Sequence, residues 1–208
     1  MSHIQALPNP EVAQPAEFSF TVENLAKAQA FIAKYPAGKQ QSAVMPLLDL
    51  AQRQNQNWIP VAAMDYIADL LEMPRIRVYE VVSFYTMFHQ NPVGKHHIQV
   101  CTTTPCWLRG SADLVKTCQS KLGIGFGETT ADGQFSMVEV ECLGACVNAP
   151  MLQINDDFYE DLTPERMGQL IDALKAGNPI QPGSQSGRLG SQAQAGPTSL
   201  TDNSKVKA

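Results

Sequence analysis

Two pairs of cysteines, set far apart along the chain, constrain its fold more than any other feature of the sequence. Four residues separate the first pair, Cys101 and Cys106, and three separate the second pair, Cys142 and Cys146. Another 35 residues lie between the pairs. Each pair directly follows a segment with the pattern of a β-strand. If these strands are neighbours that end at the same edge of a sheet, the two cysteine loops lie side by side and four thiolates converge.

The segments around the cysteine loops predict a sheet with helices packed on it. Residues 97–101 alternate with period two, and 135–140 and 151–154 also have strand patterns. Apolar residues share one helical face over 111–122, and Thr163-Pro164 has the residue types that begin a helix. The order strand, helix, strand, strand, helix predicts an α+β or α/β domain with a thioredoxin-like arrangement.

The rest of the chain is predicted to be helical before this domain and unstructured at both ends. Apolar residues recur at helical spacing over 18–92, which predicts a helical domain. The thioredoxin-like domain then covers 93–177. Residues 1–17 carry three prolines among polar and small residues, and we expect a flexible arm there. Residues 178–208 are rich in Gly, Ser, Gln and Pro with few large apolar side chains, which predicts a disordered tail.

The charge and the apolar content of the chain limit its partners and its location. The formal net charge is −5, whereas nucleic acid binding needs a basic face. No apolar run approaches the roughly 18 residues that cross a bilayer. The first twenty residues have neither the basic residues nor the apolar core of a leader. We therefore expect no nucleic acid partner and a location most simply in a bacterial cytoplasm.

The spacing of the cysteines favours iron and sulfide over zinc. In a reducing compartment, clustered cysteines bind metal or do redox chemistry more often than they form disulfides. A [2Fe–2S] cluster takes four ligands, two on each iron, usually thiolates. Structural zinc commonly uses C-x₂-C, so the gaps seen here are less typical of a Cys₄ zinc module, which remains an alternative. A thioredoxin-like disulfide enzyme is disfavoured because neither pair is C-x-x-C. Four thiolates leave a cluster negatively charged, so we expect a one-electron carrier of low potential.

The other candidates for chemistry have simpler interpretations. Cys118 lies on the apolar face of its helix, which predicts a buried packing residue. His96 and His97 flank a strand start and are expected at the surface or the sheet edge. An acidic cluster lacks the order of a calcium loop, so we expect a solvated turn or a partner contact. Its members are Asp156, Asp157, Glu160 and Asp161. No nucleotide-binding motif stands between a strand and a helix, so the chain alone is expected to bind neither NADH nor FMN.

Several motifs follow one another in a fixed order between residues 80 and 150. They are Glu80-Val81-Val82-Ser83-Phe84-Tyr85-Thr86-Met87-Phe88, Pro92-Val93-Gly94-Lys95, the first cysteine loop, Val140-Glu141-Cys142-Leu143-Gly144-Ala145-Cys146 and Ala149-Pro150. Together they resemble the [2Fe–2S] subunit of NADH–quinone oxidoreductase (respiratory complex I), the subunit lettered E, from about residue 20 to 175. The resemblance implies a helical N-terminal domain, a thioredoxin-like C-terminal domain, and one [2Fe–2S] cluster. The implied ligands are Cys101, Cys106, Cys142 and Cys146.

The resemblance also implies a place in a larger assembly. The implied partner is a flavoprotein subunit that carries NADH, FMN and a [4Fe–4S] cluster, with further complex I subunits beyond it. In such an assembly the [2Fe–2S] cluster exchanges single electrons with the flavin from a side position. The implied location is the cytoplasmic side of a bacterial inner membrane. Related modules occur in NAD-linked hydrogenases and formate dehydrogenases, and the motifs do not separate these from complex I.

Overall fold

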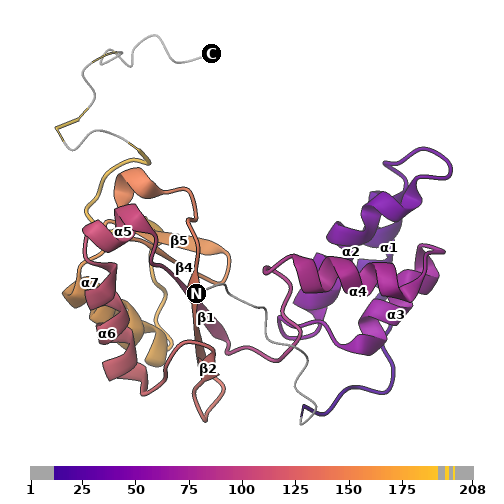
Figure 1. The fold of residues 1–208 in the computed structure, drawn as a ribbon, viewed down its shortest axis with the longest axis horizontal. Helices are drawn as coiled ribbons and strands as arrows, with labels where there is room; N and C mark the ends of the chain where they lie inside the picture. Colours follow the sequence, from indigo (N-terminus) through magenta and orange to yellow (C-terminus); the bar gives the residue numbers. More distant parts are fainter. Residues whose placement is uncertain (1–11, 192–194, 197–198, 200–208) are drawn as a thin grey trace. The chain divides into compact units, whose positions relative to one another are not determined.

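The chain divides into two compact units after Lys95 in a computed structural model that describes residues 12–191, 195–196 and 199 (Figure 1). We call the first the helical unit and the second, which begins at His96, the sheet unit. Most of the predicted flexible arm, residues 1–11, lies outside the described residues. Throughout the described part of the chain, the helices are too short or too polar to span a lipid bilayer.

The helical unit consists of short helices that begin where the sequence places capping residues and prolines. The Thr21 hydroxyl accepts a hydrogen bond from the Asn24 amide at 3.2 Å and so caps the first helix. Pro60 immediately precedes the helix that begins at Val61, and Pro74 the helix that begins at Arg75. At these positions the missing backbone N–H of proline costs little, because it would have no partner within the helix. The helices are α1 (Val22–Ile32), η1 (Gln40–Ala43), α2 (Val44–Gln54), α3 (Val61–Leu70) and α4 (Arg75–Phe84).

One apolar core holds these helices together and confirms the helical periodicity. Every α-helix of the unit contributes buried residues to it, and so do Ile59, between α2 and α3, and Phe88, in the segment after α4. In α2 the apolar residues at helical spacing form the buried face; they are Val44, Leu47, Leu48 and Ala51. Burying a Leu or Ile side chain contributes about 1.5–3 kcal/mol, so this face is enough to orient the helix.

The sheet unit is built on a six-stranded sheet with the strand order β2-β3-β1-β4-β5-β6. Its central pair is parallel: β1 and β3 run in register from His96 opposite Phe135 to Cys101 opposite Val140. On the other side of β1 the next two strands pair antiparallel, and β6 pairs parallel with β5. The strands are β1 (His96–Cys101), β2 (Glu128–Thr129), β3 (Phe135–Val140), β4 (Leu152–Ile154), β5 (Asp157–Glu160) and β6 (Gly183–Ser184).

Two long helices, α6 (Ser111–Leu122) and α7 (Pro164–Lys175), lie side by side against the sheet (Figure 1). The Thr163 hydroxyl accepts from the Arg166 amide at 3.2 Å and caps α7, as predicted. Cys118 is fully buried in the core between α6 and the sheet, which confirms it as a packing residue. The chain therefore has the predicted mixture of helices and sheet in a thioredoxin-like fold.

Three features of the sheet unit differ from the predictions. His97 is buried, and its Nδ1 lies 2.7 Å from the Ser136 hydroxyl on the neighbouring strand, because β1 is central and not at an edge. The acidic cluster is not only a turn, since part of it forms β5. The segment after 178 was predicted to lack structure, but ordered contacts continue to Gly190. The last residues of the predicted tail, including 200–208, lie outside the described residues.

Candidate metal centre

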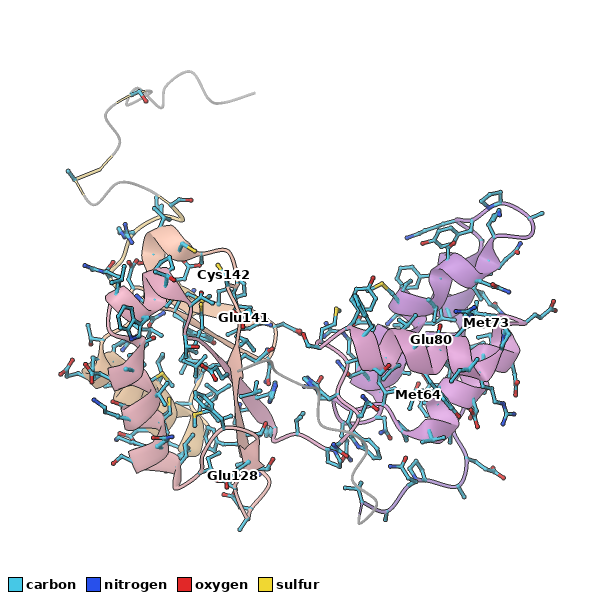
Figure 2. All side chains as sticks on the ribbon, in the orientation of Figure 1. Met64, Met73, Glu80, Glu128, Glu141 and Cys142 are labelled. Carbon is cyan, nitrogen blue, oxygen red and sulfur yellow. The ribbon has the colours of Figure 1, made fainter. Side chains whose placement is uncertain are left out.

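The two cysteine loops lie at one edge of the sheet because two parallel strands end there. Cys101 is the last residue of β1 and is paired with Val140, the last residue of β3. Cys142 follows only two residues later. Figure 2 shows Cys142 and Glu141 at one end of the sheet unit and Glu128, on β2, at the other. Residues about 40 positions apart in the sequence are thus brought together by the β1–β3 register, as the strand patterns predict.

The first cysteine pair is held inside the fold. Cys101 and Cys106 are each only 1% exposed and pack with Ala149 and Met151 in a small apolar cluster. Cys106 lies in the short helix α5 (Thr104–Leu108), which turns the chain back immediately after β1. Burial, and then a hydrogen bond with Cys101, raises the pKa of Cys106 to about 12. Metal binding displaces the thiol proton, so a buried cysteine that ligates a metal is a thiolate even though burial alone disfavours the ionised form.

The second cysteine pair is exposed and already close together. Cys142 Sγ and Cys146 Sγ lie 3.2 Å apart as free thiols. The Gly144 amide donates to Cys142 Sγ at 3.4 Å, and Gly144 has φ +88°, a backbone conformation that glycine adopts without strain. The hydrogen bond with Cys146, followed by the Gly144 amide, lowers the pKa of Cys142. The same sulfur–sulfur contact raises the pKa of Cys146.

Thr103 connects the two loops. Its hydroxyl lies 3.1 Å from Cys101 Sγ in the first loop, and Thr103 also contributes, after Cys146 and the Gly144 amide, to the lowered pKa of Cys142 in the second loop. The charges of Cys101 and Cys146 in turn act on Cys106 and raise its pKa. Cys146, in the second loop, thus acts on the pKa of Cys106, in the first.

The four thiols are the kind of donor that a [2Fe–2S] cluster needs. They come as two pairs, one buried and one exposed. Among the described residues, no group of three or more His, Cys, Asp or Glu side chains is placed so that it could hold a metal ion. A [2Fe–2S] cluster takes two thiolates on each iron, whereas structural zinc gathers four ligands around one ion. The donor set and its two-by-two arrangement therefore suit a [2Fe–2S] cluster.

Residues that the sequence analysis did not select also shape this edge of the sheet. Asn148 is buried just after the second pair, and its Nδ2 donates to Glu160 Oε2 at 2.5 Å. The Thr102 hydroxyl donates to Glu139 Oε1 at 2.5 Å and so joins the first loop to β3. An asparagine two positions after a cysteine was the one available signal for Asn148. Its partner on β5 could not be found without the strand pairing.

A family model for thioredoxin-like [2Fe–2S] ferredoxins matches residues 28–175. The chain is 63% identical over 158 residues to the E-type subunit of NADH-quinone oxidoreductase from Rickettsia bellii, covering 76% of this chain and 95% of that one. It is 54% identical over 185 residues to the mitochondrial NADH dehydrogenase [ubiquinone] flavoprotein 2 of Dictyostelium discoideum, covering 89% of this chain and 75% of that one. Both cysteine loops lie within the family match.

Solved structures with a similar fold come from a second kind of enzyme. An NAD⁺-reducing [NiFe]-hydrogenase in the H₂-reduced state matches with a TM-score of 0.57 and 25% identity over 64% of this chain. This chain spans only 23% of that hydrogenase chain. The similarity indicates that the same kind of module occurs inside a larger hydrogenase chain.

Proposed function

The chain belongs to the family of the E-type subunit of NADH-quinone oxidoreductase, within the thioredoxin-like [2Fe–2S] ferredoxins, and from this premise we propose that its four paired cysteines hold the cluster. The proposed ligands are Cys101, Cys106, Cys142 and Cys146. The chain is an oxidoreductase subunit, the [2Fe–2S] electron carrier of an NADH dehydrogenase module. The observation that supports the ligand assignment is that the two pairs of free thiols follow β1 and β3, which are parallel neighbours and end side by side.

The residues around the thiols suit a site that passes single electrons. When bound, the cluster would supply one-electron chemistry. The first pair anchors the site in the apolar interior, whereas the second pair is exposed. Electrons would therefore enter and leave on the side of the second pair. The Gly144 amide donates to Cys142 Sγ, and the Thr103 hydroxyl lies 3.1 Å from Cys101 Sγ, where it would donate to a thiolate. Such hydrogen bonds stabilise thiolate charge and tune a potential.

We propose that a flavoprotein subunit carrying NADH, FMN and a [4Fe–4S] cluster covers this face. Large apolar side chains next to the ligands are exposed: Trp107 is 62%, Leu108 70% and Val147 61% exposed. They closely follow Cys106 and Cys146 in the sequence. Exposed apolar groups beside a redox site are typical of a docking surface, and aromatic residues often dominate the binding energy of such surfaces.

Electron exchange with the isolated flavoprotein subunit tests this proposal. We expect NADH alone to leave the oxidised cluster unchanged. A chain reduced with dithionite, freed of excess reductant and mixed anaerobically with the oxidised flavoprotein should pass one electron to the flavin, and the visible absorbance of the oxidised cluster should return. Trp107→Ser should weaken the complex at least about ten-fold, because it removes an aromatic side chain that the partner would bury.

Phe126→Ser is the matched control for this experiment. Phe126 is also an exposed aromatic residue, but it precedes β2, at the end of the sheet away from the cysteine loops. Its replacement should leave affinity and exchange unchanged. Direct reduction of the isolated chain by NADH, or equal affinities for the Trp107 variant and the parent chain, would contradict the proposed partner.

The type of complex and its location can be tested by purification of the native assembly. We propose a respiratory complex on the cytoplasmic side of a bacterial inner membrane, with the chain attached only through its partner subunits. The high identity to the Rickettsia bellii relative over 95% of its length supports this assignment over an NAD-linked hydrogenase or formate dehydrogenase. Co-purification with a membrane-bound NADH–quinone activity is the expected result. Co-purification with hydrogenase or formate dehydrogenase activity would favour the alternative.

A further inference from the structure

A segment beyond the family match runs back to the second cysteine loop. The match ends at residue 175, whereas β6 (Gly183–Ser184) adds a strand to the edge of the sheet beside β5. The Gln185 amide then donates to the Glu160 carbonyl at 2.8 Å. We call residues 183–190 the strap, because the segment continues from this edge strand across to the residues that follow the second cysteine pair.

An ion pair fastens the strap to the end of β5. The Asp161 carboxylate is 13% exposed and the Arg188 guanidinium 18%. Arg188 donates through Nε to Asp161 Oδ2 at 3.0 Å and through Nη2 to Asp161 Oδ1. The Ser184 hydroxyl donates to Asp161 Oδ2 at 2.5 Å. Arg188 and Asp161 thus form a bidentate, largely buried ion pair, which is a strong kind of charge-assisted hydrogen bond. Exposed ion pairs such as Lys27–Glu23, Arg77–Glu80 and Lys116–Asp113 contribute much less to stability.

The fastened strap holds the backbone immediately after Cys146. Arg188 Nη2 also donates to the Val147 carbonyl at 3.3 Å, and Asn148 Nδ2 donates to the Gly190 carbonyl at 2.7 Å. The Asp161 amide donates to the Asn148 carbonyl at 2.7 Å. Val147 and Asn148 are thus held from two directions, by the strap and by the end of β5. Because Cys146 is exposed, this backbone is a major constraint on where its sulfur lies.

We propose that the strap is a positioning element for the cluster: through the Asp161–Arg188 pair it keeps the second cysteine loop in ligating geometry and slows the loss of iron. The inference rests on the proposed ligand assignment and adds two residues, Asp161 and Arg188, that act through the backbone after Cys146 rather than on a ligand atom. Groups that orient a metal ligand from outside commonly matter nearly as much as the ligands. Asp161, a member of the acidic cluster of the sequence, therefore has a defined charged partner within this chain.

The rate of cluster loss to an iron chelator tests the strap. In Arg188→Gln and in Asp161→Asn, the visible absorbance should bleach about ten-fold faster than in the parent chain, as expected when a group that orients a ligand is removed. The double variant should bleach no faster than the worse single variant, because both changes open the same contact. Arg188→Lys keeps the positive charge but cannot form the bidentate hydrogen bonds of a guanidinium, so we expect a bleaching rate between those of the parent chain and Arg188→Gln.

Lys121→Ala is the matched control. Lys121 pairs with Asp172 at 2.5 Å, so it joins α6 to α7 in the same unit and not the strap to β5. Its loss should leave the bleaching rate unchanged. A second readout is independent of the cluster: in the iron-free chain, the amides of Asp161 and Gln185 should exchange hydrogen faster in Arg188→Gln, while the amides that pair β1 with β3 keep their protection.

The outcomes separate the strap from the ligand assignment. Equal bleaching rates in the parent chain, Arg188→Gln and Asp161→Asn would overturn the strap, even though the parent chain holds its cluster. Additive effects in the double variant would also overturn it, since the two residues would then act separately. A parent chain that never binds iron and sulfide would instead contradict the ligand assignment, and in that case the exchange of the Asp161 and Gln185 amides still tests whether the strap holds the loop.

Discussion

We expect a chain in which serine replaces any one of the four paired cysteines to lose most of its [2Fe–2S] signal, whereas Cys118→Ser should keep it. A serine hydroxyl ionises far less readily than a thiol, and one of the two irons would be held by one thiolate fewer. The two pairs should nevertheless differ in a second way. When iron-free chains are compared, Cys142→Ser and Cys146→Ser alter only exposed side chains and should leave the stability of the sheet unit unchanged. Cys101→Ser and Cys106→Ser place a hydroxyl in an apolar cluster and should also destabilise the sheet unit by about 1–3 kcal/mol.

Electron paramagnetic resonance of the dithionite-reduced protein, together with urea unfolding, checks both parts of this result. Cys118→Ser is the matched control because Cys118 is also a fully buried thiol of the sheet unit, lying in a different core cluster. A variant at one of the four positions that retains the full signal would contradict the ligand assignment. Loss of the signal in Cys118→Ser without any loss of stability would contradict it as well.

Removal of iron should loosen the sheet unit and leave the helical unit as it was. The second cysteine loop is exposed and the cluster would join it to the first loop, so the empty chain loses a connection between β1 and β3. Metal binding that occurs only in the folded state is folding free energy. We expect the melting temperature of the sheet unit to fall by at least about 5 °C. The helical unit has its own apolar core and should not respond.

Site-specific signals separate the two units in this experiment. The chain has two tryptophans, Trp58 in the helical unit and Trp107 in the sheet unit, so a Trp107→Phe background makes the fluorescence report on Trp58 alone. Hydrogen exchange of the β1 and β3 amides reports on the sheet unit. If the melting temperature reported by Trp58 fell as much as that of the sheet unit, the cluster would stabilise the whole chain. This result would contradict the independence of the two cores.

The part of the site that lies within regular secondary structure could be predicted from the sequence. The period-two pattern of 97–101 and the strand pattern at 135–140 predicted two strands, and these strands are parallel neighbours that bring the cysteine loops together. The helical face that contains Cys118 predicted its burial correctly. Local periodicity carries this information because one face of each element must be buried.

The parts that depend on contacts between distant segments could not be predicted in this way. The prediction for His97 was wrong because its burial depends on the central position of β1 in the sheet. The residues of a strand do not indicate where that strand lies in the strand order. Helix α5 is only five residues long, too short to show a helical period. Arg188 lies in a Gly- and Ser-rich segment, where composition predicts no structure, and its order comes from Asp161, 27 positions earlier. Such pairings become visible only when the chain is folded.

The central claim is that four thiolates from two distant loops share one pair of irons. Metal and acid-labile sulfide analysis of the intact protein, purified without oxygen, tests this most directly. We predict iron and sulfide in equal amounts, about two of each per chain. One zinc per chain with no sulfide would contradict the account.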